Sequence, residues 1–212
     1  MNKFDRAGFT LKELSKKYGK YPRTGLKNWK NDWQLLFAVI LSARSNDDQI
    51  NKITLRLFKK YPSIKALADA DFESLALDIK SSGFYNAKAK HLQEAARSII
   101  ANHSSKVPSK LDQLIKLPGV GRKTANVFQG VIYGRSEGIA VDTHVARMSR
   151  RLKLTSKKTA EKIETAIMKL YPKSKYHLIN PILFWHGRTI CVARKPKCEV
   201  CQLNYFCPSS LI

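Results

Sequence analysis

The four cysteines of this 212-residue chain are its most reactive side chains, and all of them lie after residue 190. They follow the pattern Cys191-x6-Cys198-x2-Cys201-x5-Cys207. Cysteines this closely spaced bind a metal ion or an iron–sulfur cluster when the compartment keeps thiols reduced. Zinc ribbons usually combine two Cys-x-x-Cys pairs, and this chain has one. The spacing therefore favours a four-thiolate iron–sulfur cluster modestly over zinc.

A glycine-containing turn between two helical segments is a candidate phosphate site. The pattern covers about residues 109–132, and Leu117-Pro118-Gly119-Val120-Gly121 forces a tight reversal after a short helix that we expect to run to Leu117. Gly119 and Gly121 leave backbone N–H groups uncovered beside the N-terminus of the second helix, which suits a phosphate oxygen. A Gly-x-Gly pair alone is a weak signal, but two helices joined by this turn are a much stronger one.

Two residues near this turn have side chains suited to covalent and acid–base chemistry. Lys123 lies in the first turn of the second helix, where the positive end of the helix dipole and the neighbouring Arg122 disfavour an ammonium. The neutral amine, which attacks electrophilic carbon, is favoured there. Asp142 precedes Thr143-His144 at the start of a basic helix, where aspartate is a common N-cap. A capping role and a catalytic role for this carboxylate are compatible.

The elements that must position these residues show helical periodicity. Apolar residues recur at i, i+3, i+4, i+7 and i+8 from Trp33 to Leu41, which predicts one face of a helix. Similar stripes predict helices that begin near residues 11, 50, 72, 85 and 160. No convincing alternating strand and no internal repeat is present. The sequence therefore predicts an all-α fold.

Composition excludes several classes of protein. The chain is 43% hydrophobic, so it can bury a core and is not intrinsically disordered. Its longest apolar run, residues 35–41, is far too short to cross a membrane. Residues 1–6 contain no apolar signal core, so we expect an intracellular protein.

The charge balance points to a polyanionic partner. The chain has 39 Lys and Arg against 16 Asp and Glu, a formal net charge of +23. The basic residues are segregated, because residues 147–158 and 168–197 contain six and seven of them and no acid. Cationic surfaces gain affinity for nucleic acids by releasing phosphate counterions. This distribution favours nucleic acid over a merely solvated surface.

Together, the hairpin Leu117–Val127, the Val141–His144 segment and the cysteine loop resemble the endonuclease III family of the helix–hairpin–helix superfamily. The likeness covers about residues 30–208. It also includes Leu41-Ser42-Ala43, Gly83-Phe84-Tyr85-Asn86 and His186-Gly187-Arg188.

The resemblance implies a fold of two helical domains that flank a DNA-binding groove. A six-helix barrel would span residues 26–137 and include the helix–hairpin–helix. A second domain would join residues 1–25 to 138–212 and carry the iron–sulfur loop 191–207. A [4Fe–4S] cluster would be bound by Cys191, Cys198, Cys201 and Cys207.

The resemblance also implies an activity, namely a bifunctional DNA glycosylase and AP lyase of base excision repair. Such an enzyme turns an oxidised pyrimidine out of duplex DNA, removes it and cuts the abasic strand by β-elimination. Lys123 would be the nucleophile and Asp142 the catalytic carboxylate. We expect a cytoplasmic, nucleoid-associated monomer whose partner is duplex DNA with a damaged base or an abasic site. The expected DNA contacts are Arg44, Phe84, Gly119, Gly121, Arg122, Arg147, Arg194, Lys195 and Lys197.

Two of these contacts depart from the family's common residues. Arg44 stands where glutamine is common after Leu-Ser-Ala, and Phe84 stands where leucine is common after the glycine. We expect Phe84 to wedge into the gap left by the extruded base, where stacking on an aromatic ring is favourable. Packing of Phe84 against Tyr85 is the alternative. Arg44 would bind the orphaned opposite base, with guanine the best match for its fork.

Two other functions remain open from the residues alone. A monofunctional mismatch glycosylase on the same scaffold would lack the Schiff-base lysine, so Lys123 argues against it. The other is a non-catalytic helix–hairpin–helix DNA-binding module. In such a module, the occurrence of Lys123 and Asp142 in the correct register would be a coincidence.

Overall fold

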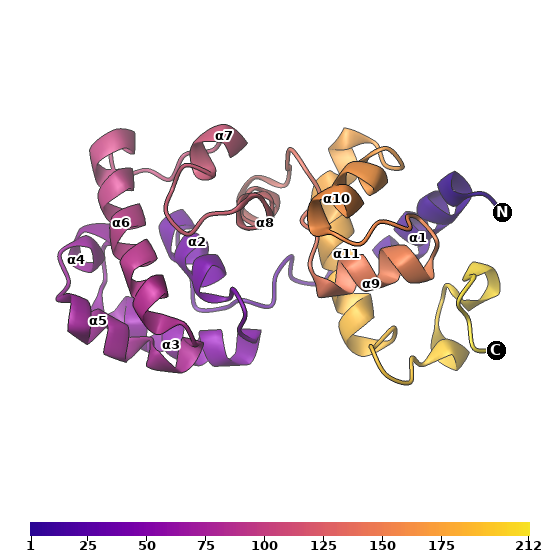
Figure 1. Cartoon of the computed structure of the whole chain (residues 1–212), viewed down its shortest axis with the longest axis horizontal. Coiled ribbons are helices and arrows are strands. Elements are labelled where there is room, and N and C mark those ends of the chain that lie inside the picture. Colours follow the sequence, from indigo (N-terminus) through magenta and orange to yellow (C-terminus); the bar gives the residue numbers. More distant parts are fainter. The chain divides into compact units, whose positions relative to one another are not determined.

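The computed structural model describes residues 1–212, and every regular element in it is helical (Figure 1). The α-helices are α1 (Lys3–Tyr18), α2 (Asp32–Leu41), α3 (Asp47–Lys60), α4 (Ile64–Ala68), α5 (Phe72–Asp78), α6 (Tyr85–His103), α7 (Leu111–Leu114), α8 (Arg122–Tyr133), α9 (Thr143–Arg151), α10 (Ala160–Met168) and α11 (Tyr176–Thr189). Four short 3₁₀ turns complete the fold, η1 (Lys80–Ser82), η2 (Lys173–Lys175), η3 (Cys198–Val200) and η4 (Asn204–Phe206). The predicted all-α fold is confirmed.

The chain divides into two compact units. Unit 1 joins residues 1–24 to 129–212, and unit 2 is residues 25–128. The boundary between 128 and 129 falls inside α8, whereas the sequence predicted a boundary after residue 137. Helix α8 is continuous across the boundary, so it contributes residues to both units. The domain limits 26 and 137 stay predictions.

Unit 2 is built around α2. Every residue from Trp33 to Leu41 is buried, so α2 is enclosed on all sides rather than buried along one stripe. Asn31 caps its N-terminus by accepting from the Gln34 N–H at 3.3 Å. Helices α3 and α6 pack against it, and α6 also covers α4 and α5 (Figure 1).

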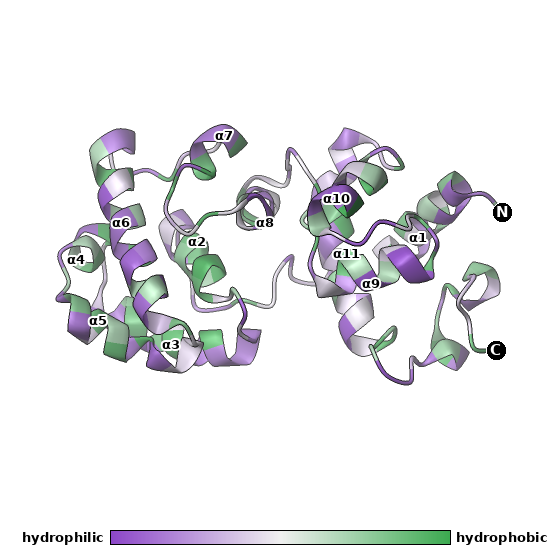
Figure 2. Ribbon diagram, viewed as in Figure 1, coloured by the Kyte–Doolittle hydropathy of each residue, from purple (hydrophilic) through white to green (hydrophobic).

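Unit 1 brings the two ends of the chain together. The N-terminal helix α1 lies along α11, and α11 packs on α9. Their shared core contains Leu14, Val145, Met148, Ile179 and Leu183, each almost fully buried. The helix surfaces alternate between hydrophobic and hydrophilic stripes, as amphipathic helices around a core require (Figure 2).

Two helices had no counterpart in the predicted pattern, the five-residue α4 and the long α11. The latter continues through Pro181, which lacks a backbone N–H and would be unfavourable in an isolated helix. Packing between α1 and α9 holds it helical. No helix of the chain has the length and hydropathy needed to cross a membrane.

Candidate active site and cluster centre

The connection between the two helices of the hairpin in unit 2 is longer than the sequence suggested. Its first helix, α7, ends at Leu114 rather than at Leu117. Two further turns close the reversal, because Leu117 N–H donates to Leu114 O at 3.1 Å and Val120 N–H donates to Leu117 O at 3.0 Å. The second helix starts at once, since Ala125 N–H donates to Gly121 O at 3.0 Å.

The absence of a side chain has a different consequence at each of the two glycines of this turn. Gly119 has a φ of +75°, and a Cβ there would lie 2.9 Å from the Cβ of His91 on α6, so neither the backbone conformation nor the packing admits a side chain. At Gly121 a Cβ would meet nothing within 4 Å. Gly121 therefore keeps the start of α8 open to close approach by a ligand. The phosphate contact of both glycines stays a prediction.

Lys123 is exposed at the second position of α8. The opposite face of the same helix is anchored by buried Ala125 and Phe128, which fixes the direction in which the lysine leaves the helix. No acidic side chain forms a salt bridge with Lys123. Its neighbour Arg122 is also exposed. The amine is thus accessible, as a nucleophile must be.

Asp142 of unit 1 is the N-cap of α9, as expected. Its Oδ1 accepts from Val145 N–H at 2.8 Å, and its Oδ2 accepts from Asn180 Nδ2 of α11 at 3.3 Å. The same Asn180 amide donates to Ala140 O at 2.9 Å. Asn180 therefore links the Asp142 carboxylate to the backbone of the segment that precedes α9. Each carboxylate oxygen can accept a second hydrogen bond, so Asp142 is oriented and still has acceptor capacity. Asn180 was not anticipated from the sequence.

Arg44 and Phe84 meet in unit 2, although 40 positions separate them in the sequence. The Arg44 guanidinium lies over the Phe84 ring at 5.3 Å from its centroid, a cation–π contact. Phe84 is 64% exposed, so the alternative that it packs inward against Tyr85 is wrong. Both residues have left-handed backbone conformations, with φ of +55° and +52°. Strained non-glycine residues of this kind concentrate at functional sites.

A buried lysine holds the two segments that carry this pair. Lys88 of α6 is only 5% exposed. Its Nζ donates to Leu41 O at 2.7 Å, three residues before Arg44, and to Ser82 O at 2.8 Å, two residues before Phe84. Burial lowers the pKa of Lys88. Lys88 is therefore a clamp between the end of α2 and the turn before α6, and the sequence analysis missed it.

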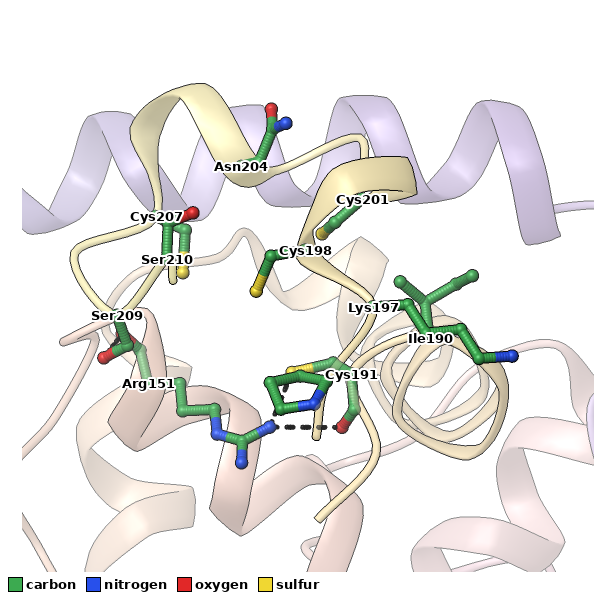
Figure 3. Close-up of a pocket in the computed structure, with 11 residues that line it drawn as sticks. Arg151, Ile190, Cys191, Lys197, Cys198, Cys201, Asn204, Cys207, Ser209 and Ser210 are labelled. Carbon is green, nitrogen blue, oxygen red and sulfur yellow. Dashed lines mark hydrogen bonds between the residues drawn. The ribbon is translucent and has the colours of Figure 1, made fainter. Parts of the chain in front are cut away.

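The four cysteines surround one pocket in unit 1, with their sulfurs turned toward it (Figure 3). All four are free thiols. Four cysteine thiolates around one pocket are the usual ligand set of an iron–sulfur cluster. Burial raises the pKa of the Cys201 and Cys207 thiols. Iron would compensate the buried thiolates, so the site fits the expected group.

Two arginines of α9 fasten the beginning of the cysteine loop. Arg151 donates to Cys191 Sγ at 3.2 Å (Figure 3). It also donates to Val192 O at 2.8 Å. Arg147 donates to Cys191 O at 2.9 Å and to Gly187 O at 2.7 Å. The Arg147 guanidinium thus has a structural role that the sequence did not reveal, and its predicted DNA contact stays a prediction.

His186 connects the cysteine loop to α1. It is fully buried, with Nδ1 3.2 Å from the Tyr18 hydroxyl and Nε2 3.4 Å from Cys201 Sγ. Burial lowers the pKa of His186 to about 4, so the ring is neutral at pH 7 and has one proton to donate. A thiolate can only accept, so a ligated Cys201 requires the proton on Nε2 and leaves Nδ1 to accept from Tyr18. His186 thus has a structural role, because it links α1 to the cysteine loop.

The remaining predicted DNA contacts lie on the surface of the cysteine loop. Arg194, Lys195 and Lys197 are all exposed, and none forms a salt bridge. Lys197 also lines the thiol pocket. Their cationic groups are available to an anionic partner.

Known proteins share this sequence pattern over most of its length. Residues 37–173 match the HhH-GPD superfamily of base excision DNA repair proteins, and residues 191–207 match the iron–sulfur binding domain of endonuclease III. The chain is 44% identical to endonuclease III of Synechocystis over 177 residues, which is 84% of this chain and 81% of the relative. It is 40% identical to endonuclease III of Bacillus subtilis over 178 residues, with the same coverage.

Solved structures show the same relation in three dimensions. A trapped endonuclease III–DNA covalent intermediate matches with a TM-score of 0.91 at 36% identity, covering 99% of this chain and 98% of that one. A thermostable thymine-DNA glycosylase matches less closely, with a TM-score of 0.80 at 25% identity over 96% and 94% of the two chains. The match to the thymine-DNA glycosylase is thus the weaker of the two.

Proposed function

Since this chain belongs to the endonuclease III family of base excision DNA repair proteins, we propose that its DNA glycosylase and AP lyase activities use Lys123 as nucleophile and Asp142 as catalytic carboxylate. The observation that carries this assignment is the exposed lysine at the start of α8, directly after the hairpin turn with its open Gly121. A mismatch-specific monofunctional glycosylase and a non-catalytic binding module are both less consistent with such a lysine. The substrate is duplex DNA that contains a damaged pyrimidine or an abasic site.

The lysine performs the bond-making step. The lone pair of Lys123 Nζ forms a bond to C1′ of the damaged nucleotide, and the glycosidic C–N bond breaks. The base leaves with that electron pair and takes up a proton. The bound amine then loses a proton and the sugar ring opens, which produces a Schiff base. Loss of a C2′ proton breaks the C3′–O bond and cuts the strand 3′ to the lesion, and water finally releases Lys123.

Asp142 supports this chemistry in two ways. Its carboxylate accepts the proton that the attacking amine must lose, and its negative charge stabilises the oxocarbenium-like charge that develops on the sugar. The hydrogen bonds from Val145 N–H and Asn180 Nδ2 fix its orientation before substrate arrives. Asn180 is thus a positioning residue.

The [4Fe–4S] cofactor of the family has its ligands at Cys191, Cys198, Cys201 and Cys207 in this proposal. When bound, it cross-links a loop that has little apolar core of its own. The loop then holds Arg194, Lys195 and Lys197 where phosphates of the DNA backbone can contact them. No step of base removal or strand cutting passes through the cofactor.

Arg44 and Phe84 act together on the DNA gap. The Phe84 ring enters the space of the extruded base, and the arginine stacked on it hydrogen-bonds the orphaned partner base. The cation–π contact gives the pair a defined arrangement before DNA binds. The protein acts as a monomer, and we place it in the cytoplasm at the nucleoid because chromosomal DNA is its substrate.

Borohydride trapping on an abasic duplex tests these roles. The chain should form a covalent protein–DNA adduct in the presence of borohydride and should nick the duplex in its absence. Lys123→Gln should form no adduct and cut no strand, while it still binds the duplex. Base release without an adduct would instead support a monofunctional glycosylase, and binding without either reaction would support a non-catalytic module.

A further inference from the structure

A second cavity in unit 1 lies between the start of α1, the end of α9 and the end of α10. Its volume is about 780 Å³, which is in the range of ligand sites. It shares no residue with the thiol pocket. The lining consists of Lys3, Phe4, Arg150, Lys153, Leu154, Thr155, Ser156, Lys157, Ala166, Lys169 and Leu170. We call it the basic pocket.

Positive charge is concentrated and unneutralised in the basic pocket. Five of its lining residues are Lys or Arg and none is Asp or Glu. All five are exposed, and none takes part in a salt bridge. Unit 1 as a whole has 22 Lys and Arg against 7 Asp and Glu, so its net charge is also strongly positive. Such a concave cationic surface attracts consecutive phosphates and releases their counterions.

The wall of the basic pocket is fixed by hydrogen bonds rather than loosely formed. Arg6 of α1 donates from Nε to Leu152 O at 2.8 Å and from a terminal nitrogen to Lys153 O at 3.1 Å. Lys153 has a left-handed backbone conformation, and the next residue, Leu154, closes the end of α9 by donating its N–H to Ser149 O at 2.8 Å. These contacts fix the backbone at Lys153, from which its exposed side chain extends. Helices α9 and α10 both show hydrophilic segments in Figure 2.

An exposed aromatic ring gives this pocket more than charge. Phe4 is 56% exposed although it lines a cavity. Lys3 Nζ lies 5.5 Å from the centroid of its ring. Phosphate-binding cations combined with an exposed aromatic ring are typical of sites for single-stranded nucleic acid, because unpaired bases stack on the ring while the backbone follows the cations. A paired duplex offers no free base face for such stacking.

We propose that the basic pocket binds unpaired nucleotides of a DNA strand, in addition to the damaged duplex on which the enzyme acts. The phosphates contact Lys153, Lys157 and Lys169, and one base stacks on Phe4. The same phosphate chemistry could come from inorganic polyphosphate, which has no base. A response to the Phe4 ring therefore distinguishes the two sources.

Fluorescence anisotropy of a labelled oligo-dT 12-mer tests this site in the full-length, cluster-containing protein. A saturating excess of unlabelled duplex with an uncleavable abasic analogue occupies the repair site during the measurement. We expect oligo-dT still to bind saturably. The triple variant Lys153→Ala, Lys157→Ala, Lys169→Ala should weaken that binding at least about tenfold and lower the slope of log affinity against log salt by about 2, because each lost phosphate contact removes about 0.7. A matched control, Lys20→Ala, Lys173→Ala, Lys175→Ala, removes equal charge elsewhere in unit 1 and should change the affinity less than about twofold.

The aromatic contribution has its own pair of variants. Phe4→Ala should weaken oligo-dT binding at least about fivefold, the lower end of what one stacked base contributes, and Phe4→Trp should restore it. Neither variant should alter the binding of inorganic polyphosphate. If oligo-dT fails to bind the duplex-saturated protein, or if both triple variants lose affinity equally, the site is overturned. If Phe4→Ala leaves oligo-dT binding unchanged, the assignment to unpaired nucleotides is overturned.

Failure of this proposal is distinguishable from failure of the proposed function. Nicking of an abasic duplex is measured on the same preparations, and the basic-pocket variants should cut at the rate of the unaltered protein. If the unaltered protein nicks normally but does not bind oligo-dT, the basic pocket alone is rejected. Normal oligo-dT binding by a protein that does not nick rejects the glycosylase and lyase roles alone.

Discussion

Replacing the buried clamp Lys88 by methionine should separate recognition of the lesion from general DNA binding. Methionine keeps the length and most of the volume of lysine but removes both hydrogen bonds, to Leu41 O and Ser82 O. The segments that carry Arg44 and Phe84 would then lose their common anchor. Since both residues have strained left-handed backbones, we expect them to relax away from the arrangement that suits the DNA gap.

Two opposing contributions set the change in the free energy of unfolding that Lys88→Met should cause. Two hydrogen bonds from a charged donor stabilise the fold by about 1.5–3 kcal/mol each. Burial of the lysine, which lowers its pKa, opposes this because the charged amine is partly desolvated. We expect a net loss of about 2–4 kcal/mol in the free energy of unfolding, most of it from the two carbonyls left without their donor. The variant should therefore remain folded at room temperature.

Affinity for two duplexes, one with an abasic analogue and one undamaged, provides the assay. Lys88→Met should lose at least about fivefold in affinity for the lesion duplex, because the stacking contribution of Phe84 is about 1–3 kcal/mol, and should keep its affinity for the undamaged duplex. Phe84→Ala should show the same selective loss. Lys90→Met, which changes an exposed lysine on the same helix, is the matched control and should change neither affinity. Equal losses on both duplexes, or none on either, would refute the clamp.

Three further predictions concern other parts of the molecule. Asp142→Asn should slow base release and strand cutting severely yet leave the melting temperature nearly unchanged, because asparagine caps a helix as well as aspartate does; a large drop in thermal stability would point to a structural role instead. Cys198→Ser should lose the iron and the proteolytic resistance of residues 191–207 before it affects single-turnover cutting, and a colourless but protease-resistant loop would contradict the cross-linking role. Tyr171→Phe should raise the free energy of unfolding by about 1–2 kcal/mol, because the buried hydroxyl has no hydrogen-bond partner. Burial raises the pKa of Tyr171, so the unfolded chain loses its proton first and the native protein loses stability above pH 10; urea titrations at pH 8 and 11 should show a smaller alkaline loss in the phenylalanine variant.

Local sequence patterns predicted the parts of the site that depend on local structure. The cysteine spacing indicated a cluster loop, and the glycine turn followed by a helix indicated where Lys123 would lie. Asp142 followed from its position before a basic helix. Each of these features is encoded within a few residues, so pattern and spacing are sufficient to find them.

The anchoring residues required the tertiary fold. Arg151 of α9 contacts Cys191, and His186 of α11 contacts Cys201. Neither the charge of the arginine nor the burial of the histidine reveals from the sequence which cysteine it contacts. The sequence does contain a signal for Lys88, because it lies four residues before Leu92 on the apolar face of α6. A lysine at such a position needs buried hydrogen-bond acceptors. The Arg44–Phe84 contact joins two distant turns, so no local pattern could reveal it.

Mapping the covalent adduct tests the central assignment most directly. The complex trapped by borohydride on an abasic duplex is digested with nuclease and trypsin, and the peptide that retains the sugar remnant is sequenced by mass spectrometry. Trypsin does not cleave after a modified lysine, so the remnant should lie on Lys123 within a peptide of residues 123–135. A remnant on the N-terminal amine or on any other lysine, with residue 123 unmodified, would contradict the assignment of the nucleophile.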